Sequence, residues 1–145
     1  MLRKNRENNI PESLFWDASY LIAYLAPGDQ YHKKALKLRK HLTHKKIKLI
    51  TSWPIISEAS TILFYHYGYS HALALFSALK AFEIIMPFKE EYQEATLLFE
   101  ELNQDQKLSF NDVLTYLIIR KRLKNISLLT FDKDFSKVGL TIFIP

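Results

Sequence analysis

The 145-residue chain contains no cysteine, which excludes disulfides, zinc–thiolate sites and iron–sulfur clusters. Its only glycines, Gly28, Gly68 and Gly139, are isolated, so the chain carries neither a P-loop nor a dinucleotide-binding fingerprint. No apolar run reaches the roughly 18 residues that a membrane span requires, and no apolar segment of a signal peptide follows the basic N-terminus. We therefore expect a cytoplasmic protein that uses neither ATP nor NAD and has no membrane partner.

Acidic residues are absent from positions 30–57, although this stretch holds eight lysines and arginines, and the net charge of the chain is +5. A second basic cluster spans positions 120–124. Basic clusters supply most of the affinity for phosphate backbones, but a solvated helix face produces the same pattern. The residues that we expect to contact a nucleic-acid backbone are Lys45, Lys46, Arg120 and Lys121.

The distribution of apolar residues divides the chain into a tail and one domain. Residues 1–13 are polar, and we expect them to form a flexible N-terminal tail. Short apolar runs in the remainder, residues 14–145, alternate with helical patterns. The strands are predicted near 14–17, 48–51, 84–86, 127–130 and 141–144. This alternation predicts an α/β fold with a central parallel sheet of about five strands and helices on both faces.

Helical spacing predicts the elements between these strands. A short helix is expected over 18–25, and Ser52 is expected to cap a helix that ends at Gly68. The helix predicted between Phe88 and Leu102 carries one apolar stripe, which predicts that this side of the helix is buried. The stripe consists of Phe88, Tyr92, Ala95, Phe99 and Leu102.

Four carboxylates stand where such a fold gathers ligands. Asp17 and Asp132 end apolar runs at opposite ends of the chain, and Glu58 and Asp112 lie near the starts of predicted helices. In open α/β sheets the ligand crevice lies outside the carboxyl ends of the strands. Without cysteine, and with no histidine in these motifs, an acidic cluster there predicts an oxygen-ligand site for a hard cation such as Mg²⁺ or Mn²⁺.

Each acidic position also has a purely structural interpretation. Asp17 is a preferred N-cap residue, and the segment Ser109–Asp112 fits a capping box. Glu58, one turn into a helix, could be an ordinary surface residue, although its apolar neighbours make this costly if the side chain faces inward. Asp132 and Asp134 could be turn formers. Single positions leave these alternatives open.

Five motifs occur in an order that resembles the PIN-domain family, especially the small VapC-type toxins. They are Asp17–Ala23, Asp29–Ala35, Ser52 followed by Glu58, Ser109–Asp112 and Thr130–Phe135. The resemblance covers residues 14–145 and implies a PIN-like nuclease domain, a three-layer sandwich with a parallel sheet between helices.

The resemblance also implies a site and partners. It assigns the catalytic and metal-binding quartet to Asp17, Glu58, Asp112 and Asp132. Ser19 and Thr130 match positions that support this quartet, whereas Asp134 matches a variable position. The implied activity is that of an Mg²⁺- or Mn²⁺-dependent ribonuclease toxin. The implied partners are an RNA substrate, a cognate antitoxin protein and a second copy in a homodimer.

Two other functions remain open at this point. The scaffold could be a catalytically inactive module that binds RNA or protein, although an intact acidic quartet disfavours this. Asp17 could instead accept a phosphoryl group in a phosphotransfer domain, although such folds favour a second aspartate where Ser19 stands. Trp53, Phe64 and Tyr65 are candidate antitoxin contacts, with core packing as the simpler role.

Overall fold

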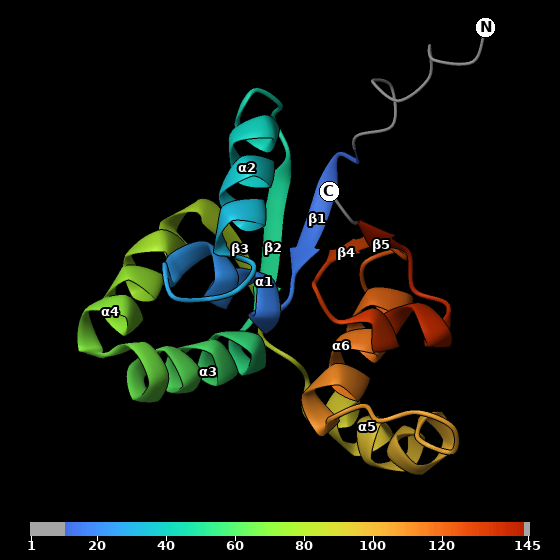
Figure 1. Ribbon diagram of the computed structural model, residues 1–145. Coiled ribbons are helices and arrows are strands. Elements are labelled where there is room, and N and C mark those ends of the chain that lie inside the picture. Colours follow the sequence, from blue (N-terminus) through green and yellow to red (C-terminus); the bar gives the residue numbers. More distant parts are fainter. Residues whose placement is uncertain (1–10, 144–145) are drawn as a thin grey trace, which may run out of the picture.

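The computed structural model describes residues 11–143 and contains five parallel strands in the order β3-β2-β1-β4-β5 (Figure 1). The strands are β1 (Ser13–Trp16), β2 (Lys48–Ser52), β3 (Phe82–Ile85), β4 (Ser127–Leu129) and β5 (Ile142–Phe143). The central strand β1 is apolar on both faces, with Leu14, Phe15 and Trp16 at most 1% exposed. Both faces of this strand are therefore covered, as the predicted α/β fold requires.

Six α-helices surround the sheet. They are α1 (Ala18–Leu25), α2 (His32–Thr43), α3 (Trp53–Ile62), α4 (Tyr69–Ala78), α5 (Lys89–Leu102) and α6 (Phe110–Lys121). Short helical turns add η1 (Leu63–Tyr67), η2 (Leu79–Ala81) and η3 (Lys133–Val138). In Figure 1 α1–α4 form one group on the left and α5 with α6 another at the lower right, with β1 and β2 in the centre and β4 and β5 above α6. The predicted α/β sandwich with an all-parallel sheet is thus confirmed.

The N-terminal boundary of the domain differs from the prediction. Ser13 belongs to β1 and pairs with Lys48 of β2, and the Lys48 N–H donates to the Glu12 carbonyl at 2.8 Å. Backbone pairing does not depend on side-chain polarity, so polar residues continue the strand into the segment assigned to the tail. Ser13 of the predicted tail thus belongs to β1 and Glu12 bonds to β2, while residues 1–10 of that segment lie outside the described residues.

Helix α5 buries a different face from the predicted one. Ala95 is buried, but Phe88, Tyr92 and Phe99 are 57%, 37% and 41% exposed. The buried side of the helix begins at Glu91, whose carboxylate accepts hydrogen bonds from the Phe88 N–H at 2.8 Å and from Arg122 Nη1 at 2.7 Å. Both bonds end on Oε1, and Oε2 is buried without a partner among the described residues. The ion pair with Arg122 nevertheless allows Glu91 to be buried, so the hydrophobic pattern alone gave the wrong face.

Capping and chain direction position the functional side chains. Ser52 Oγ accepts a hydrogen bond from the Ile55 N–H at 3.4 Å and caps α3, with Pro54 in the first turn, as predicted. Because all strands are parallel, the carboxyl ends of β1 and β4 lie at one edge of the sheet. Asp17 and Thr130 immediately follow these two ends. Among residues 11–143, none of the helices has the length and hydropathy of a membrane-spanning segment.

Candidate active site

Asp17 is held at the carboxyl end of β1 by two hydroxyl groups. Its side chain is buried, with only 5% of the residue exposed. Oδ2 of Asp17 accepts hydrogen bonds from Thr130 Oγ1 at 2.8 Å and from Ser19 Oγ at 3.1 Å. The two hydroxyls are themselves 3.0 Å apart. Both side-chain bonds end on Oδ2, so neither hydroxyl occupies the second oxygen of Asp17.

The same two hydroxyls also fix the loop that follows β4. Ser19 Oγ accepts a hydrogen bond from the Phe131 N–H, and Thr130 Oγ1 accepts one from the Asp132 N–H, both at 3.0 Å. Asp132 Oδ1 in turn accepts the Asp134 N–H at 2.9 Å. The turn-forming role considered for Asp132 is therefore present, and its carboxylate is oriented by it.

An aromatic stack, which the sequence did not indicate, supports this loop. The Phe131 ring stacks on Tyr31 with ring centroids 4.4 Å apart and on Tyr20 with centroids 5.6 Å apart. The Tyr20 hydroxyl donates to the Ala35 carbonyl at 2.7 Å. The stack joins the β4 loop to α1 and to the start of α2, so three distant segments determine where Asp132 lies.

Asp112 occupies the first turn of α6, where the predicted capping box forms. Ser109 Oγ accepts the Asp112 N–H at 3.1 Å, and Asp112 Oδ2 accepts the Ser109 N–H at 2.9 Å. The structural interpretation of Asp112 is thus correct as geometry. The cap does not exclude a second role for Asp112, because the Ser109 N–H binds only Oδ2 and the cap does not use Oδ1.

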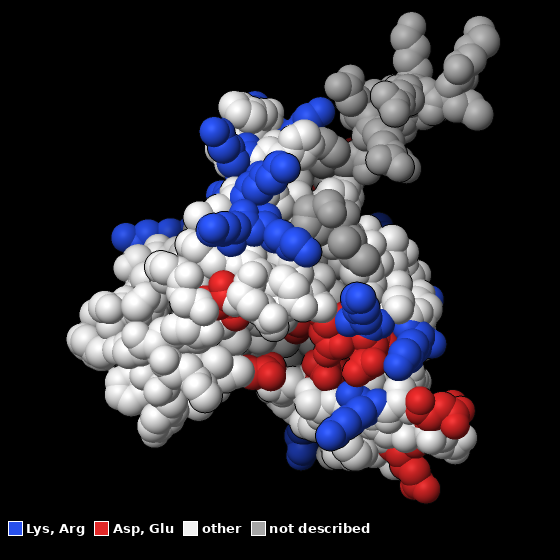
Figure 2. Space-filling view, in the orientation of Figure 1, with Lys and Arg blue, Asp and Glu red and all other residues white. Residues whose placement is uncertain are grey.

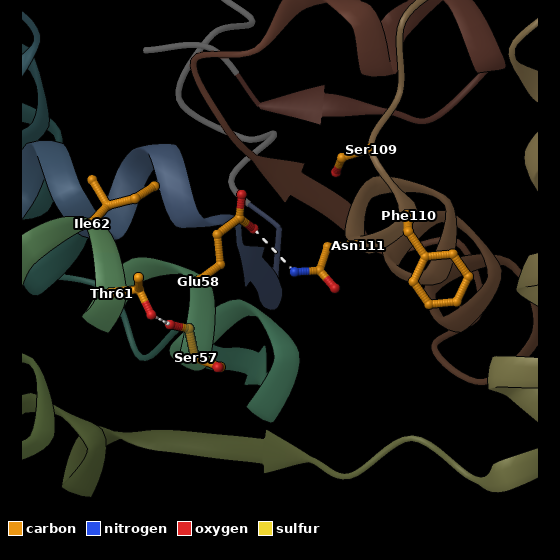
Figure 3. A pocket seen from close by; sticks show the side chains of 7 residues that line it. All are labelled: Ser57, Glu58, Thr61, Ile62, Ser109, Phe110 and Asn111. Carbon is orange, nitrogen blue, oxygen red and sulfur yellow. Dashed lines mark hydrogen bonds between the residues drawn. The ribbon is translucent and has the colours of Figure 1, made fainter.

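Glu58 faces the start of α6 across an open pocket. Figure 3 shows its carboxylate pointing from α3 toward Asn111, whose Nδ2 donates to Glu58 Oε2 at 3.5 Å. The pocket has a volume of about 440 Å³. It is lined by Ser57, Glu58, Thr61, Ile62, Ser109, Phe110 and Asn111.

Burial and mutual repulsion raise the pKa of three carboxyl groups. The pKa of Asp17 is raised by burial, with a further contribution from the charge of Glu58. The pKa of Glu58 is raised by burial and by the charge of Asp112. The pKa of Asp112 is raised to about 6, by burial first and then by the charges of Asp17 and Asp132. The four acidic residues therefore act on one another as one electrostatic cluster.

The surface around this cluster is polarised. Figure 2 shows Asp and Glu side chains gathered near the centre of one face, with Lys and Arg side chains close by. Within the described part of the chain, no three His, Asp or Glu side chains already stand as a complete group of metal ligands. The donor set still fits a hard cation, because Mg²⁺ retains several waters and needs only one or two carboxylates directly.

The four predicted nucleic-acid contacts lie in two separate parts of the structure. Lys45 and Lys46 are exposed but lie between α2 and the start of β2, at the edge of the sheet opposite the carboxylates. Arg120 donates to the Gly139 carbonyl at 2.9 Å, and Lys121 pairs with Glu94. Gly139 suits the Arg120 contact because its φ is +80° and a Cβ there would meet the guanidinium at 2.9 Å.

Lys133 is a basic residue near the site that the sequence analysis did not single out. It is exposed, directly follows Asp132, and makes no salt bridge within residues 11–143. Lys34, also exposed, has its Nζ 5.8 Å from the ring centroid of Tyr31, which stacks on Phe131. Adjacency to the aspartate after a predicted strand could have identified Lys133.

The fold and the spacing of these residues match one protein family. A model of the PIN domain matches residues 14–140. The chain belongs to the PIN domain family. This membership agrees with the parallel sheet and disfavours the phosphotransfer alternative for Asp17. No curated protein sequence matches the chain at a significant level.

Three solved structures resemble the chain in fold. VapC20 of Mycobacterium tuberculosis, described as a sarcin–ricin loop cleaving toxin, has a TM-score of 0.80 at 24% identity and covers 91% of this chain and 99% of its own. VapBC2 of Rickettsia felis, bound to a promoter DNA fragment, has a TM-score of 0.65 at 15% identity, over 90% and 96%. PAE2754 of Pyrobaculum aerophilum has a TM-score of 0.62 at 20% identity, over 90% and 87%.

A divalent cation is expected to stabilise this PIN domain in a pH-dependent way. The pKa of Asp112 is about 6 in the folded chain against a usual 3.8, so the folded state holds this proton more tightly than the unfolded state. The resulting stabilisation is complete below about pH 4 and is lost as pH rises through about 6. Mg²⁺ or Mn²⁺ should therefore raise the Tm at pH 7 and change it little at pH 4.

This expectation can be checked by scanning calorimetry of the chelator-treated protein at both pH values. Potassium chloride at matched ionic strength is the control, since general screening would raise the Tm with either salt. An equal effect of both salts at pH 7 would contradict a cation site at the carboxylate cluster.

Proposed function

We propose that this PIN domain is an Mg²⁺- or Mn²⁺-dependent ribonuclease, the toxin of a toxin–antitoxin pair. The observation that carries the proposal is the gathering of Asp17, Glu58, Asp112 and Asp132 at one edge of the sheet, where neighbouring charges help to raise the pKa of the first three. Repelling carboxylates cost stability unless a bound cation or a proton neutralises them, so such a cluster favours a cation site. The similarity of fold to a sarcin–ricin loop cleaving toxin supports the same choice.

Each residue of the cluster has a role in this proposal. Asp17 and Asp112 would bind the cation directly, while Glu58 and Asp132 would act through its water shell or orient the attacking water. The bound cation would supply charge neutralisation at the phosphoryl oxygens and a more acidic water. Ser19 and Thr130 would keep Asp17 Oδ2 hydrogen-bonded, so that its other oxygen keeps one direction.

The direct test is incubation of the purified chain with RNA and Mn²⁺, with and without a chelator. Cleavage that requires Mn²⁺ and disappears with the chelator is the expected result. A protein that binds RNA but leaves it intact under Mn²⁺ would contradict the proposal and support the inactive binding module.

RNA is expected to reach the site past Lys133 rather than past the α2–β2 turn. Lys133→Glu places a repelling charge beside the cluster and should weaken RNA binding about fivefold or more, since each phosphate contact contributes measurably to affinity. Lys46→Glu is the matched control, equal in charge change but at the opposite edge of the sheet. Fluorescence anisotropy at two salt concentrations measures both effects. A larger loss for Lys46→Glu would restore the path along Lys45 and Lys46.

The proposed function also includes an antitoxin partner and a homodimer. The proposed substrate is RNA in the cytoplasm. Trp53, Phe64 and Tyr65 are 43%, 48% and 78% exposed, so none of them has the core-packing role. Exposed aromatics on α3 and η1 offer contact area for an apolar partner segment. Growth arrest on expression, relieved by a co-expressed neighbouring gene product, and a dimer in light scattering are the expected results.

A further inference from the structure

The pocket between α3 and α6 has a lining unlike that of the carboxylate cluster. Its walls are Ser57, Thr61 and Ile62 on one side and Ser109, Phe110 and Asn111 on the other (Figure 3). Glu58 lines the pocket and also belongs to the cluster. A volume of about 440 Å³ lies within the range of small-molecule sites. A ligand group bound in this pocket would therefore lie next to a group bound at the carboxylate cluster.

The charge of the lining excludes a phosphate as the occupant. None of the seven lining residues is a lysine or arginine, and the single ionisable one, Glu58, is acidic. A phosphate would be repelled by Glu58 and would find no cation to pair with. The pocket instead suits an uncharged, partly polar group attached to a longer ligand.

The polar groups of the pocket match the edge of a nucleobase. Asn111 Nδ2 makes only a long 3.5 Å hydrogen bond to Glu58, and its Oδ1 accepts none from the described residues. Ser57 Oγ also makes no hydrogen bond within residues 11–143, although the Ser57 carbonyl accepts two. An amide offers a donor and an acceptor side by side, as the Watson–Crick edge of a base requires.

Phe110 supplies an aromatic surface at the α6 side of the pocket, and Figure 3 shows its ring beyond Asn111, directed away from Glu58. It is the first residue of α6 and 37% exposed, so it is not part of the buried core. Its ring lies 6.5 Å from that of Tyr92, at an interplanar angle of 23°. Single-stranded RNA is recognised largely by bases stacked on such exposed aromatic rings.

We propose that the pocket between α3 and α6 holds one nucleobase of the RNA substrate, stacked on Phe110 and hydrogen-bonded to Asn111. This inference rests on the proposed ribonuclease function and adds to it a base-recognition site next to the carboxylates. The base enters the pocket while the adjoining phosphate lies at the acidic cluster. Cleavage is therefore selective for the base at one position.

Binding of RNA hexamers in which one position at a time lacks its base tests this site without requiring cleavage. The assay uses fluorescence anisotropy with Ca²⁺ in place of Mn²⁺, so that a hard cation neutralises the acidic cluster against which the adjoining phosphate lies. The unmutated protein should lose about tenfold in affinity when one particular base is missing, which is the size expected for a lost stacking contact. A flat response across all six positions would overturn the proposal.

Three variants assign the effect to the pocket. Phe110→Leu removes the aromatic ring and should abolish the tenfold difference, whereas Phe110→Tyr should keep it. Phe99→Leu is the matched control, since Phe99 is 41% exposed but lies on α5 outside the pocket. If Phe110→Leu fails to fold, Ser57→Trp, which fills the pocket from an exposed helix position, should have the same effect. A base difference that survives Phe110→Leu or Ser57→Trp in a folded protein would overturn the proposal.

The experiments distinguish failure of the ribonuclease proposal from failure of the base-site proposal. If the protein never cleaves RNA under Mn²⁺ but shows the Phe110-dependent base difference, the ribonuclease function fails and the base site stands. If Mn²⁺-dependent cleavage occurs with equal rates for the unmutated protein and Phe110→Leu and without a base difference in binding, the base site fails and the ribonuclease stands.

Discussion

Replacing Asp112 by asparagine is expected to reduce RNA cleavage by more than about a hundredfold. Loss of a group that only supports a metal ligand costs up to about a hundredfold, and loss of a direct ligand should cost more. The proposal makes Asp112 a direct ligand of the cation, and an amide is a poorer ligand for it than a carboxylate. Single-turnover cleavage with Mn²⁺ measures the loss. The change keeps side-chain size and an oxygen that can accept the Ser109 N–H, so the helix cap can persist.

The stability of the same variant separates the catalytic role from the capping role. Because the pKa of Asp112 is raised to about 6, its charge costs stability near neutral pH. Asp112→Asn should therefore match or exceed the Tm of the metal-free unmutated protein at pH 7, with the difference vanishing near pH 4. A variant that is inactive because it unfolds would show that the cap is the main role of Asp112.

Replacing Thr130 by valine is expected to damage both stability and activity. The hydroxyl donates to buried Asp17 at 2.8 Å and accepts the Asp132 N–H at 3.0 Å, so it connects two members of the acidic cluster. Leaving these groups without their partner should cost about 1–3 kcal/mol in the free energy of unfolding. Cleavage should fall about ten- to a hundredfold, as for lost outer-shell contacts at metal sites. Urea unfolding and cleavage rates measure the two effects.

Thr51→Val provides the matched control for this prediction. Thr51 is also fully buried, and its hydroxyl donates to the Trp16 carbonyl at 3.0 Å. This variant should lose comparable stability and keep most of its cleavage activity, because the lost bond does not reach a carboxylate. Equal losses of activity in both variants would reduce Thr130 to a purely structural residue.

The elements that depend on local chemistry could be predicted from the sequence. The helix over 18–25, the Ser52 cap and the Ser109–Asp112 capping box all follow from residues within one turn of each other. Apolar runs of a few residues predicted parallel strands, and the alternation with helices predicted the order of elements. Local hydrogen bonding and periodicity are sufficient for these features.

Features that depend on distant partners could not be predicted in this way. The exposure of Phe88 and Tyr92 follows from the pairing of Glu91 with Arg122, thirty-one residues away. The stack of Phe131 on Tyr31 and the remoteness of Lys45 from the cluster depend equally on how separate segments meet. Spacing along the chain carries no information about such pairs until the topology is known.

The sequence by itself determined that Asp17 directly follows a buried strand, that Asp132 lies in the turn after another and that Asp112 is in the first turn of a helix, because each position is set by its immediate neighbours. The tertiary structure alone decided that these acids repel one another, since only the strand order brings the ends of β1 and β4 together. It also decided that Ser19 and Thr130 share Asp17 Oδ2, and that Glu58 faces Asn111 across a pocket. The Asn111–Glu58 and Thr130–Asp17 bonds join residues that are 53 and 113 positions apart in the sequence, whereas the Ser19–Asp17 bond is local. Hydrogen bonds and charge repulsion act only over short distances in space, so the distant pairs depend on how the chain folds.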